Sequence, residues 1–324
     1  MTSQQDTTRR LRIDAIDVAR GVALVAMAVY HFCWDLEFFG YLAQGTAATG
    51  PLKWFARSIA SSFLFLVGVS LVLAHAGGPQ GAAFIRRFAK IAAAAAVITV
   101  ATYWFTPGAF VFFGILHHIA LASVLGLAFL RLSPVVVLVC AAVVLSLPLF
   151  FRAEAFGHPV LLWTGLAPTL PRSNDYVPLF PWFAMVLVGI AATGFAQRAG
   201  FLTRMSETSA GSTPPVRVLR FLGHHSLATY LLHQPVLIAG IYLFSLVSPA
   251  ERSLVDDNLA ACQRSCTEQG DSSFCTNYCG CAISKLDLEG LLEPLSRGEI
   301  TPESEPRIIT ITQDCAFEAE NAND

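Results

Sequence analysis

Charged residues are scarce in this 324-residue sequence: Asp, Glu, Lys and Arg make up 14% of it, whereas hydrophobic residues make up 54%. A soluble protein of this length would carry roughly 25% charge, so most of the chain requires an apolar environment. The sequence also lacks a basic patch, and we expect no nucleic-acid partner. Its N terminus lacks the apolar region and small-residue cleavage site of a signal peptide, so the first apolar segment is expected to remain as a helix.

Motifs of common soluble enzymes are absent as well. The sequence contains no phosphate loop, no GxGxxG that opens a helix, no HExxH and no GxSxG. We therefore expect no metal ion. Any chemistry has to come from isolated polar residues within apolar segments.

Long uncharged runs predict membrane-spanning helices, because a helix needs about 20 mostly apolar residues to cross a bilayer core of roughly 30 Å. Charged residues are missing from 58–85, 91–130, 132–151, 176–197 and 221–250. Thr106-Pro107-Gly108 divides the longest run with turn chemistry. The predicted fold is all-α, a polytopic membrane bundle of about seven helices whose lipid bilayer is its main partner. The expected spans are 17–38, 54–75, 88–106, 111–130, 134–151, 178–196 and 223–247.

Charge is unevenly distributed along the chain. Residues 1–250 contain 16 Lys or Arg and 8 Asp or Glu, whereas residues 251–324 contain 5 and 15. This change in charge balance predicts a transmembrane domain over 1–249 and an acidic tail over 250–324.

Orientation follows from the Lys and Arg residues beside the spans. If the N terminus is cytoplasmic, the cytoplasmic segments contain Arg9, Arg10, Arg12, Arg20, Arg86, Arg87, Lys90, Arg131, Arg198, Arg204, Arg217 and Arg220. The external loops then contain only Lys53, Arg57, Arg152 and Arg172. Seven crossings put the tail on the outer side.

Six of the eight cysteines lie in the tail, at Cys262, Cys266, Cys275, Cys279, Cys281 and Cys315. Each CxxxC pair lies on one face of a helix, with Gly270-Asp271 in the turn between them. An antiparallel helical hairpin could then form Cys262–Cys279 and Cys266–Cys275. Disulfides persist in an oxidising compartment; the alternative is a four-thiolate zinc site.

Ionisable residues within spans are costly to bury and are candidates for function. His31 and Asp35 lie four residues apart in the first span, so the carboxylate can orient the imidazole; a structural hydrogen bond between helices is the alternative. Asp17 and Arg20 lie near the inner end of this span, either as a helix-end ion pair or at a binding site.

The polar residues are expected in two layers, an outer one with His31 and an inner one with Asp17 and Arg20. His117 and His118 lie at about the depth of His31, and we predict that one of them meets His31 and Asp35 in a polar cavity of the outer half. Trp182 falls in this layer, as a site residue or as part of an aromatic belt. The inner layer contains His224 and His225, expected as hydrated or capping groups, and His233, as a packing or substrate residue. Arg57 and Lys53, at the outer end of the second span, either bind an anionic group or snorkel.

Five segments carry a family resemblance: 12–21 (with Met27, Tyr30-His31 and Asp35-Leu36 after it), 63–70, 113–120, 178–182 and 222–235. They resemble the catalytic domain of the heparan-α-glucosaminide N-acetyltransferase family, including its bacterial members of unknown function. Related transmembrane acyltransferases have a similar opening and end. The resemblance covers about residues 10–240 and implies a bacterial membrane protein. Together with the charge bias and the tail cysteines, we expect an inner-membrane protein with a cytoplasmic N terminus and a periplasmic tail.

The resemblance also implies transfer of an acetyl group from cytoplasmic acetyl-CoA to a sugar or glycan acceptor on the far side. His31, oriented by Asp35, would then act as a general base, and His117 or His118 would bind the thioester oxygen or the acceptor. Arg20, with neighbouring Arg residues, would hold the CoA phosphates. We group Asp17 and His233 with the donor site, and Arg57 and Trp182 with the acceptor.

Two other functions remain open from the sequence. A proton-coupled transporter would use His31, Asp35 and His117 as a relay. A non-catalytic scaffold would use the disulfide-rich tail to bind a periplasmic partner.

Overall fold

The computed structural model describes residues 14–42, 45–76, 81–202, 213–250, 254–267 and 271–321. Every regular element in these ranges is a helix, so the all-α prediction is confirmed. Some residues used in the sequence predictions lie outside the described part, namely Arg9, Arg10, Arg12, Arg204 and Gly270.

Contacts within the chain define two units. Unit 1 comprises Met1–Ala28 and Trp54–Gln234, and unit 2 comprises Val29–Lys53 and Pro235–Asp324. Three helices, α1 (Asp14–Phe38), α2 (Gly50–His75) and α9 (Ser226–Val247), contribute to both units. The predicted division at residue 249 stays a prediction.

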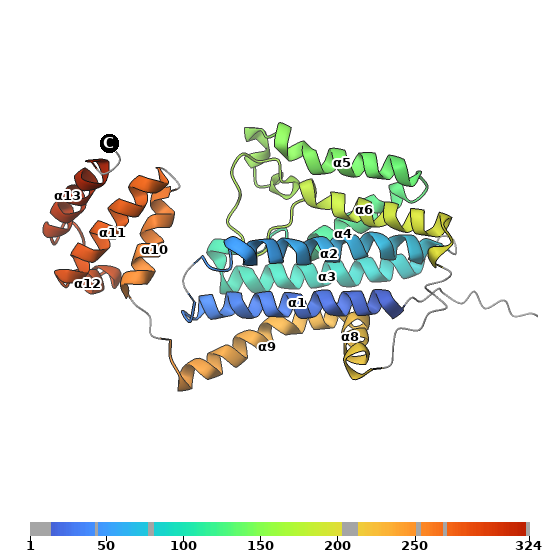
Figure 1. The fold of residues 1–324 in the computed structure, drawn as a ribbon, viewed down its shortest axis with the longest axis horizontal. Helices are drawn as coiled ribbons and strands as arrows, with labels where there is room; N and C mark the ends of the chain where they lie inside the picture. Colours follow the sequence, from blue (N-terminus) through green and yellow to red (C-terminus); the bar gives the residue numbers. More distant parts are fainter. Residues whose placement is uncertain are drawn as a thin grey trace, which may run out of the picture. The chain divides into compact units, whose positions relative to one another are not determined.

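Unit 1 contains most of the apolar helices (Figure 1). Besides the first parts of α1 and α9 and α2 from Trp54 onward, its α-helices are α3 (Gly81–Phe105), α4 (Ile115–Gly126), α5 (Pro134–Phe150), α6 (Leu179–Arg198) and α8 (Pro214–His224). Short 3-10 helices are η1 (Pro107–Ala109), η2 (Leu127–Phe129), η3 (Glu154–Gly157) and η4 (Leu162–Thr164).

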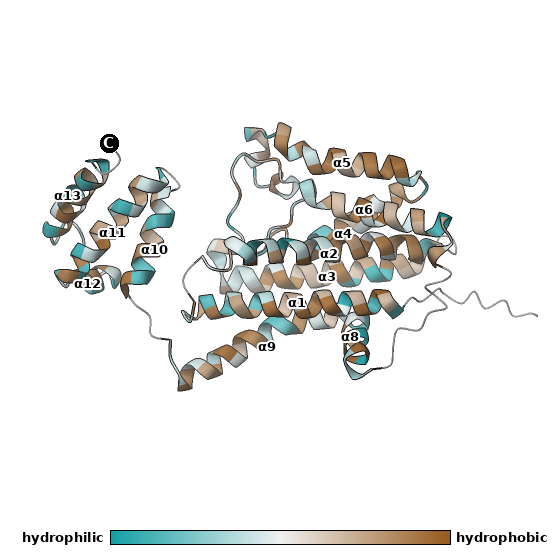
Figure 2. Ribbon diagram, viewed as in Figure 1, coloured by the Kyte–Doolittle hydropathy of each residue, from teal (hydrophilic) through white to brown (hydrophobic). Residues whose placement is uncertain are grey.

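Five helices among the described residues, α1, α2, α3, α6 and α9, are long and apolar enough to cross a membrane. The other two expected spans, 111–130 and 134–151, contain shorter apolar helices, Ile115–Phe129 and Pro134–Phe150. With 17 residues, α5 is about 26 Å long, somewhat less than a bilayer core of about 30 Å. Apolar residues cover most of α2, α5 and α6 (Figure 2). The chain is a multi-pass membrane protein.

Close contact between α2 and α6 forms the centre of unit 1. A Cβ atom on Gly68 would lie 2.1 Å from the backbone oxygen of Val186, and one on Gly189 would lie 2.1 Å from that of Phe65. Only glycine fits at both positions, as is typical of helices that pack closely in lipid. Leu64 and Leu187, both fully buried, pack beside this contact.

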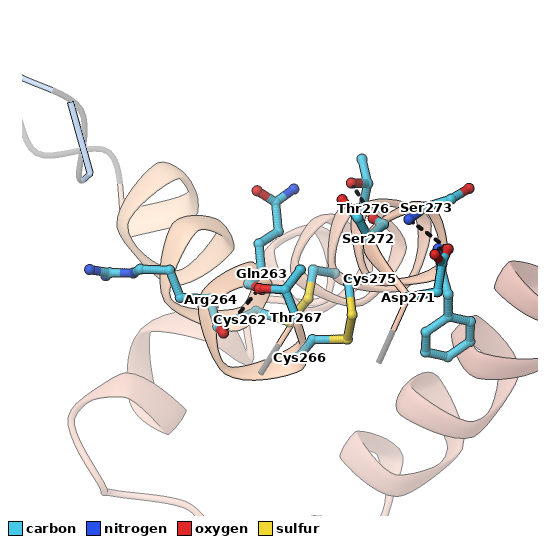
Figure 3. Close-up of a disulfide and its surroundings, with 12 residues drawn as sticks. Cys262, Gln263, Arg264, Cys266, Thr267, Asp271, Ser272, Ser273, Cys275 and Thr276 are labelled. Carbon is cyan, nitrogen blue, oxygen red and sulfur yellow. Dashed lines mark hydrogen bonds between the residues drawn. A yellow bond between two sulfur atoms is a disulfide. The ribbon is translucent and has the colours of Figure 1, made fainter. Parts of the chain in front are cut away.

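Unit 2 contains a small helical tail domain built from α10 (Leu254–Thr267), α11 (Ser272–Leu288), α12 (Leu292–Ser296) and α13 (Arg307–Asn321). Its hairpin of α10 and α11 contains the disulfides Cys262–Cys279 and Cys266–Cys275, the pairing that the CxxxC spacing predicts. Figure 3 shows Cys266 and Cys275 with their surroundings. Asp271 begins α11 by accepting hydrogen bonds from the N–H groups of Ser273 and Phe274, at 2.8 and 3.2 Å.

A third disulfide, Cys281–Cys315, joins α11 to α13. All six tail cysteines are therefore paired, and none is left as a thiolate for the zinc alternative. Cys281 and Cys315 come within 4.8 Å of a Glu318 oxygen, but their sulfur atoms are bonded to each other and have neither proton nor charge to offer.

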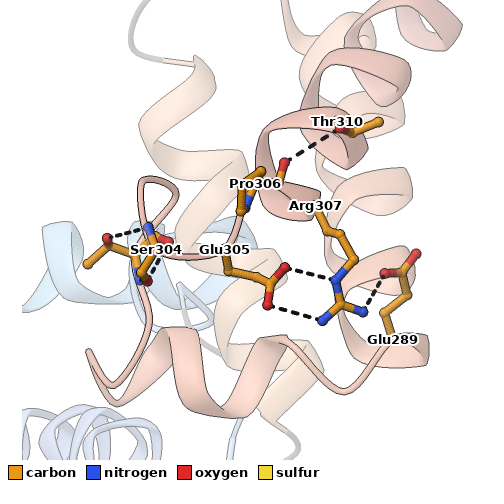
Figure 4. Close-up of polar contacts among 7 residues, drawn as sticks. Glu289, Ser304, Glu305, Pro306, Arg307 and Thr310 are labelled. Carbon is orange, nitrogen blue, oxygen red and sulfur yellow. Dashed lines mark hydrogen bonds and ion pairs between the residues drawn. The ribbon is translucent and has the colours of Figure 1, made fainter.

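Apolar packing and exposed ion pairs complete the tail domain. Its core consists of Ala282, Ile283, Leu286, Leu291, Leu292, Ile308, Ile311 and Cys315. At its surface, Arg307 donates to Glu305 at 2.8 Å and lies 3.6 Å from Glu289 (Figure 4). The hydrogen bond from Arg307 lowers the pKa of the Glu305 carboxyl.

Another part of unit 2 joins the end of α1 to the end of α9. Tyr41 donates a hydrogen bond to the backbone oxygen of Ser248, and the Phe39 and Tyr242 rings lie 6.5 Å apart. The Glu37 carboxylate accepts hydrogen bonds from the N–H groups of Gly45 and Ala47, at 2.6 and 2.7 Å. These bonds fix the turn that follows α1.

Candidate functional site

Unit 1 contains a cavity of about 970 Å³ between α1, α2, α3, α4 and the junction of α8 with α9. Its polar walls include six basic side chains: Arg20, Arg86, Arg87, Lys90, His224 and His225. They come from the start of α1, the start of α3 and the segment before α9, and they face Ser70 near the end of α2. Consecutive spans run in opposite directions, so these positions meet at one end of the bundle.

Arg20 is held firmly in this wall. Its guanidinium lies 3.1 Å from a carboxylate oxygen of Asp17 and donates to the hydroxyl of Ser70, which itself donates to the backbone oxygen of Leu66. Asp17 and Ser70 are both only 7% exposed. The predicted ion pair of Asp17 and Arg20 is therefore present.

The remaining cations give the cavity a positive potential. No carboxylate is among its lining residues in the described part of the chain, whereas Arg86, Arg87 and Lys90 project from a single stretch of α3. Clefts lined by one sign of charge attract ligands of the other sign. The chemistry of this wall suits an anion with several charged groups.

The rest of the cavity wall is mostly apolar. Phe63, Leu66 and Val67 come from α2, and Leu116 and Ile119 come from α4. A ligand that fits here has a charged part and a long apolar or weakly polar part.

The break between α3 and α4 brings polar groups into the interior of unit 1. Leu116 and Ala120 of α4 pack on Ile91, Ala94 and Ala95 of α3, so α4 begins about halfway along its neighbour. The expected span at 111–130 is helical only from residue 115. Residues 106–114 fold back along the end of α3 instead.

Irregular backbone at this depth needs hydrogen-bond partners from protein. The backbone N–H of Val111 donates to Thr102 at 2.9 Å, and its backbone oxygen accepts from Thr99 at 2.7 Å. The loop before α6 supplies further donors to the backbone oxygens of this segment: the Asn174 N–H to Ala109, the Ser173 hydroxyl to Phe110 and the Val177 N–H to Phe113, at 2.8, 3.0 and 3.1 Å. Hydrogen bonds between two segments far apart in sequence thus satisfy the backbone oxygens of residues 109, 110 and 113.

Asp175, in the same loop, caps α4. Its carboxylate accepts a hydrogen bond from the backbone N–H of Ile115 at 2.8 Å, where the helix dipole favours negative charge. A Cβ on Gly114 would lie 2.3 Å from this carboxylate oxygen, so the close approach requires glycine. Asp175 was not among the predicted site residues, because its only sequence signal is a lone acidic residue just before an apolar run.

His117 uses both ring nitrogens in the structure. The Gly114 N–H donates to its Nδ1 at 3.2 Å, so Nδ1 is an acceptor and the neutral ring carries its proton on Nε2. Nε2 then donates to the Thr99 hydroxyl at 3.1 Å, and that hydroxyl donates to Val111. His117 therefore fixes the α3–α4 turn.

His118 is different. It is fully buried, and its Nδ1 lies 3.1 Å from the backbone oxygen of Val177. A carbonyl oxygen can only accept, so Nδ1 carries the proton and Nε2 keeps its lone pair. Among the described residues Nε2 has no hydrogen-bond partner. Of the two adjacent histidines, His118 is the one with a nitrogen available for chemistry.

His31 and Asp35 belong to unit 2, on successive turns of α1. Asp35 is fully buried and His31 is partly buried. Their predicted meeting with His117 or His118 stays a prediction.

The other candidate residues have local partners. The Nδ1 of His233 lies 2.6 Å from the backbone oxygen of Tyr230. The Arg57 guanidinium lies over the Trp54 ring, 5.1 Å from its centre, which suits an anchor at the bilayer surface. Trp182 packs against the core cluster of unit 1.

These features define a polytopic helical membrane protein with a deep cationic cavity and buried imidazoles. The model of the protein family described as "Heparan-alpha-glucosaminide N-acetyltransferase, catalytic" matches residues 12–235, more than two thirds of the chain. The chain therefore belongs to this family, as its five sequence blocks predicted. No curated protein and no solved structure matches it. The cavity and both central histidines fall within the match, whereas the tail lies beyond it.

Proposed function

We propose that this protein is a membrane acyltransferase that takes an acetyl group from acetyl-CoA in the cytoplasm and passes it to a sugar or related acceptor on the other side of the membrane. Family membership supports acyl transfer of this kind. The choice of donor rests on the cavity, and the choice of acceptor class rests on the family resemblance.

The cationic cavity is the observation that carries the proposal. Acetyl-CoA has a diphosphate and a separate phosphate at one end and a long, weakly polar arm at the other. Arg20, Arg86, Arg87 and Lys90 offer guanidinium and ammonium partners for the phosphates, and the apolar wall suits the arm. At about 970 Å³, the cavity is at the upper end of the usual size of ligand sites.

In the proposed reaction, the acceptor hydroxyl or amine attacks the thioester carbonyl carbon. The new C–O or C–N bond forms as the C–S bond breaks, and the CoA sulfur leaves as a thiolate, which the proton released by the acceptor neutralises. The acceptor gives up its proton to His31, which Asp35 keeps in the productive orientation and charge state. His118, through its free Nε2, is available to polarise or position the reacting groups.

Orientation and compartment belong to the same proposal. The cavity end of the bundle carries the excess of Lys and Arg, which favours the cytoplasmic side of a bacterial inner membrane. The three disulfides of the tail favour an oxidising compartment, here the periplasm.

Calorimetric titration of acetyl-CoA into the detergent-purified protein tests the proposal. Arg87→Gln and Lys90→Gln should each weaken binding about tenfold, because each removes one charge-assisted contact to phosphate. Arg131→Gln is the matched control, since Arg131 is an exposed cation that does not line the cavity. Absence of binding, or equal effects of all three variants, would contradict the proposal. Proton-coupled flux without acetylated product would support a transporter instead.

A further inference from the structure

Helix α8 differs from every other described helix of unit 1. It has 11 residues, begins with two prolines and contains Arg217 and Arg220 between apolar residues. It also runs across the common direction of α2, α3 and α6 (Figure 1). Because those helices cross the bilayer, α8 lies along the plane of the membrane. From the sequence, Arg217 and Arg220 were expected in a cytoplasmic segment between two spans, with no helix predicted there.

One face of α8 is fixed to the first turns of α1. A Cβ on Gly21 would lie 2.0 Å from the backbone oxygen of Leu219, and one on Gly223 would lie 1.8 Å from that of Asp17. Arg220 adds an ion pair with Asp14 at 2.8 Å. The two backbones are thus in direct contact at the end of α1 that contains Arg20, which puts α8 at the boundary of the bilayer.

The opposite face mixes apolar groups with a cation. Val218 is 57% exposed and Phe221 is 62% exposed, and Arg217, also exposed, lies one turn before Phe221. None of the ion pairs among the described residues involves Arg217. Large apolar side chains do not favour bulk water, and an arginine does not favour the centre of a bilayer. The boundary between headgroups and acyl chains accommodates both.

We propose that α8 is an interfacial helix whose face of Arg217, Val218 and Phe221 binds an anionic phospholipid in the leaflet at the Arg20 end of the bundle. The guanidinium of Arg217 pairs with the headgroup phosphate. Val218 and Phe221 pack on the first methylene groups of the acyl chains. This inference does not depend on the proposed acyl transfer, because it uses only the outer face of α8 and not the cavity.

Native mass spectrometry of the detergent-purified chain, titrated with phosphatidylglycerol or phosphatidylcholine, tests the proposal. Wild type should bind phosphatidylglycerol more tightly. Arg217→Gln should reduce this binding about fivefold, as expected for about 1 kcal/mol per basic residue near an anionic surface, with little change for phosphatidylcholine. Arg264→Gln, which removes one exposed charge from the tail, is the matched control. Unchanged phosphatidylglycerol binding by Arg217→Gln would overturn the proposal.

A second measurement covers the case in which a variant fails to fold. Val218→Cys, in a Cys33→Ser and Cys140→Ser background, can be labelled with a fluorescent maleimide and reconstituted into vesicles that contain phosphatidylglycerol. A quencher attached to the acyl chain near the headgroup should quench the fluorescence more strongly than a quencher near the terminal methyl group. It should also quench more strongly than aqueous iodide. Stronger quenching by iodide would refute an interfacial position. If the protein is a dimer and the double substitution Val218→Ser and Phe221→Ser makes it monomeric, this face is instead a contact between two copies of the chain.

Discussion

Asp175 and Ile115 are joined by a 2.8 Å hydrogen bond from the Ile115 backbone N–H to the Asp175 carboxylate, across 60 residues of sequence. The bond fastens the loop before α6 to the first turn of α4 in the interior of unit 1. The same loop holds Val177, whose backbone oxygen lies against His118. The capped start of α4 thus determines where both central histidines lie.

Asp175→Ala should therefore destabilise unit 1. The change leaves the Ile115 N–H without its partner, at a cost of about 1–3 kcal/mol for a buried donor. Asp175→Asn keeps a side-chain oxygen as acceptor and should cost less. Thermal unfolding of the detergent-purified variants measures both effects, and an Ala variant as stable as wild type would show that the cap contributes nothing.

Replacement of each of the two adjacent histidines by asparagine should have different effects. The asparagine amide occupies the position of the imidazole Nδ1, and the substitution removes Nε2. His118→Asn keeps a donor for Val177 but loses the free Nε2. If His118 takes part in the proposed transfer, the rate should fall by about 10²–10⁴ with little change in melting temperature. His117→Asn, the matched control, loses the bond to Thr99 and should lower the melting temperature while largely preserving the transfer rate. If both variants have the same activity, His118 has only a structural role.

Packing of α8 on α1 gives a steric prediction. Gly21→Ala and Gly223→Ala each place a methyl group about 2 Å from a backbone oxygen that belongs to another helix. The helices must separate, at a cost of about 1–3 kcal/mol or more. Gly240→Ala in α9 meets no atom within 4 Å, and should be neutral or stabilising by up to about 1 kcal/mol. Thermal unfolding of the three variants compares them directly, and a Gly223→Ala protein as stable as Gly240→Ala would contradict this packing.

Local sequence features predicted the helices and the cysteine hairpin, because hydropathy and CxxxC spacing operate within a few turns. Thr106-Pro107-Gly108 likewise marked the break after α3. The position of α4 was not predictable, since it depends on Asp175 and the loop of residues 173–177, about 60 residues away. For the same reason the sequence left His117 and His118 equivalent: Thr99 and Val177 distinguish them only after folding.

Two other features escaped prediction for related reasons. Helix α8 is too short for a hydropathy window and is stabilised by backbone contact with α1. The Cys281–Cys315 bridge spans 34 residues and follows from the packing of α13 on α11, which no spacing rule encodes.

The three disulfides should contribute unequally to the stability of the tail. Their sequence separations are 9, 17 and 34 residues, and the chain-entropy model gives about 2.6, 3.1 and 3.8 kcal/mol for loops of these lengths. Paired serine substitution at Cys281 and Cys315 should therefore destabilise the tail most, and at Cys266 and Cys275 least. Limited proteolysis of the full-length variants under non-reducing conditions should release the tail in that order. The reverse order would contradict an entropic origin of the effect.

Substitutions at His31 and Arg20 should separate donor binding from the chemical step. His31→Ala should lower the proposed acetyl transfer by about 10²–10⁴, the usual contribution of a general base, while acetyl-CoA binding changes little, because His31 is not among the residues that line the cationic cavity. Asp35→Asn should fall between wild type and His31→Ala, since the imidazole remains but loses its orienting charge. Arg20→Ala should show the opposite pattern, with weakened donor binding, because it removes a cation from the cavity wall. Radiolabelled acetyl transfer in membranes and calorimetric binding distinguish the two patterns. Full activity in a correctly folded His31→Ala protein would exclude His31 as the base and leave His118 as the remaining candidate among the buried imidazoles of the described residues.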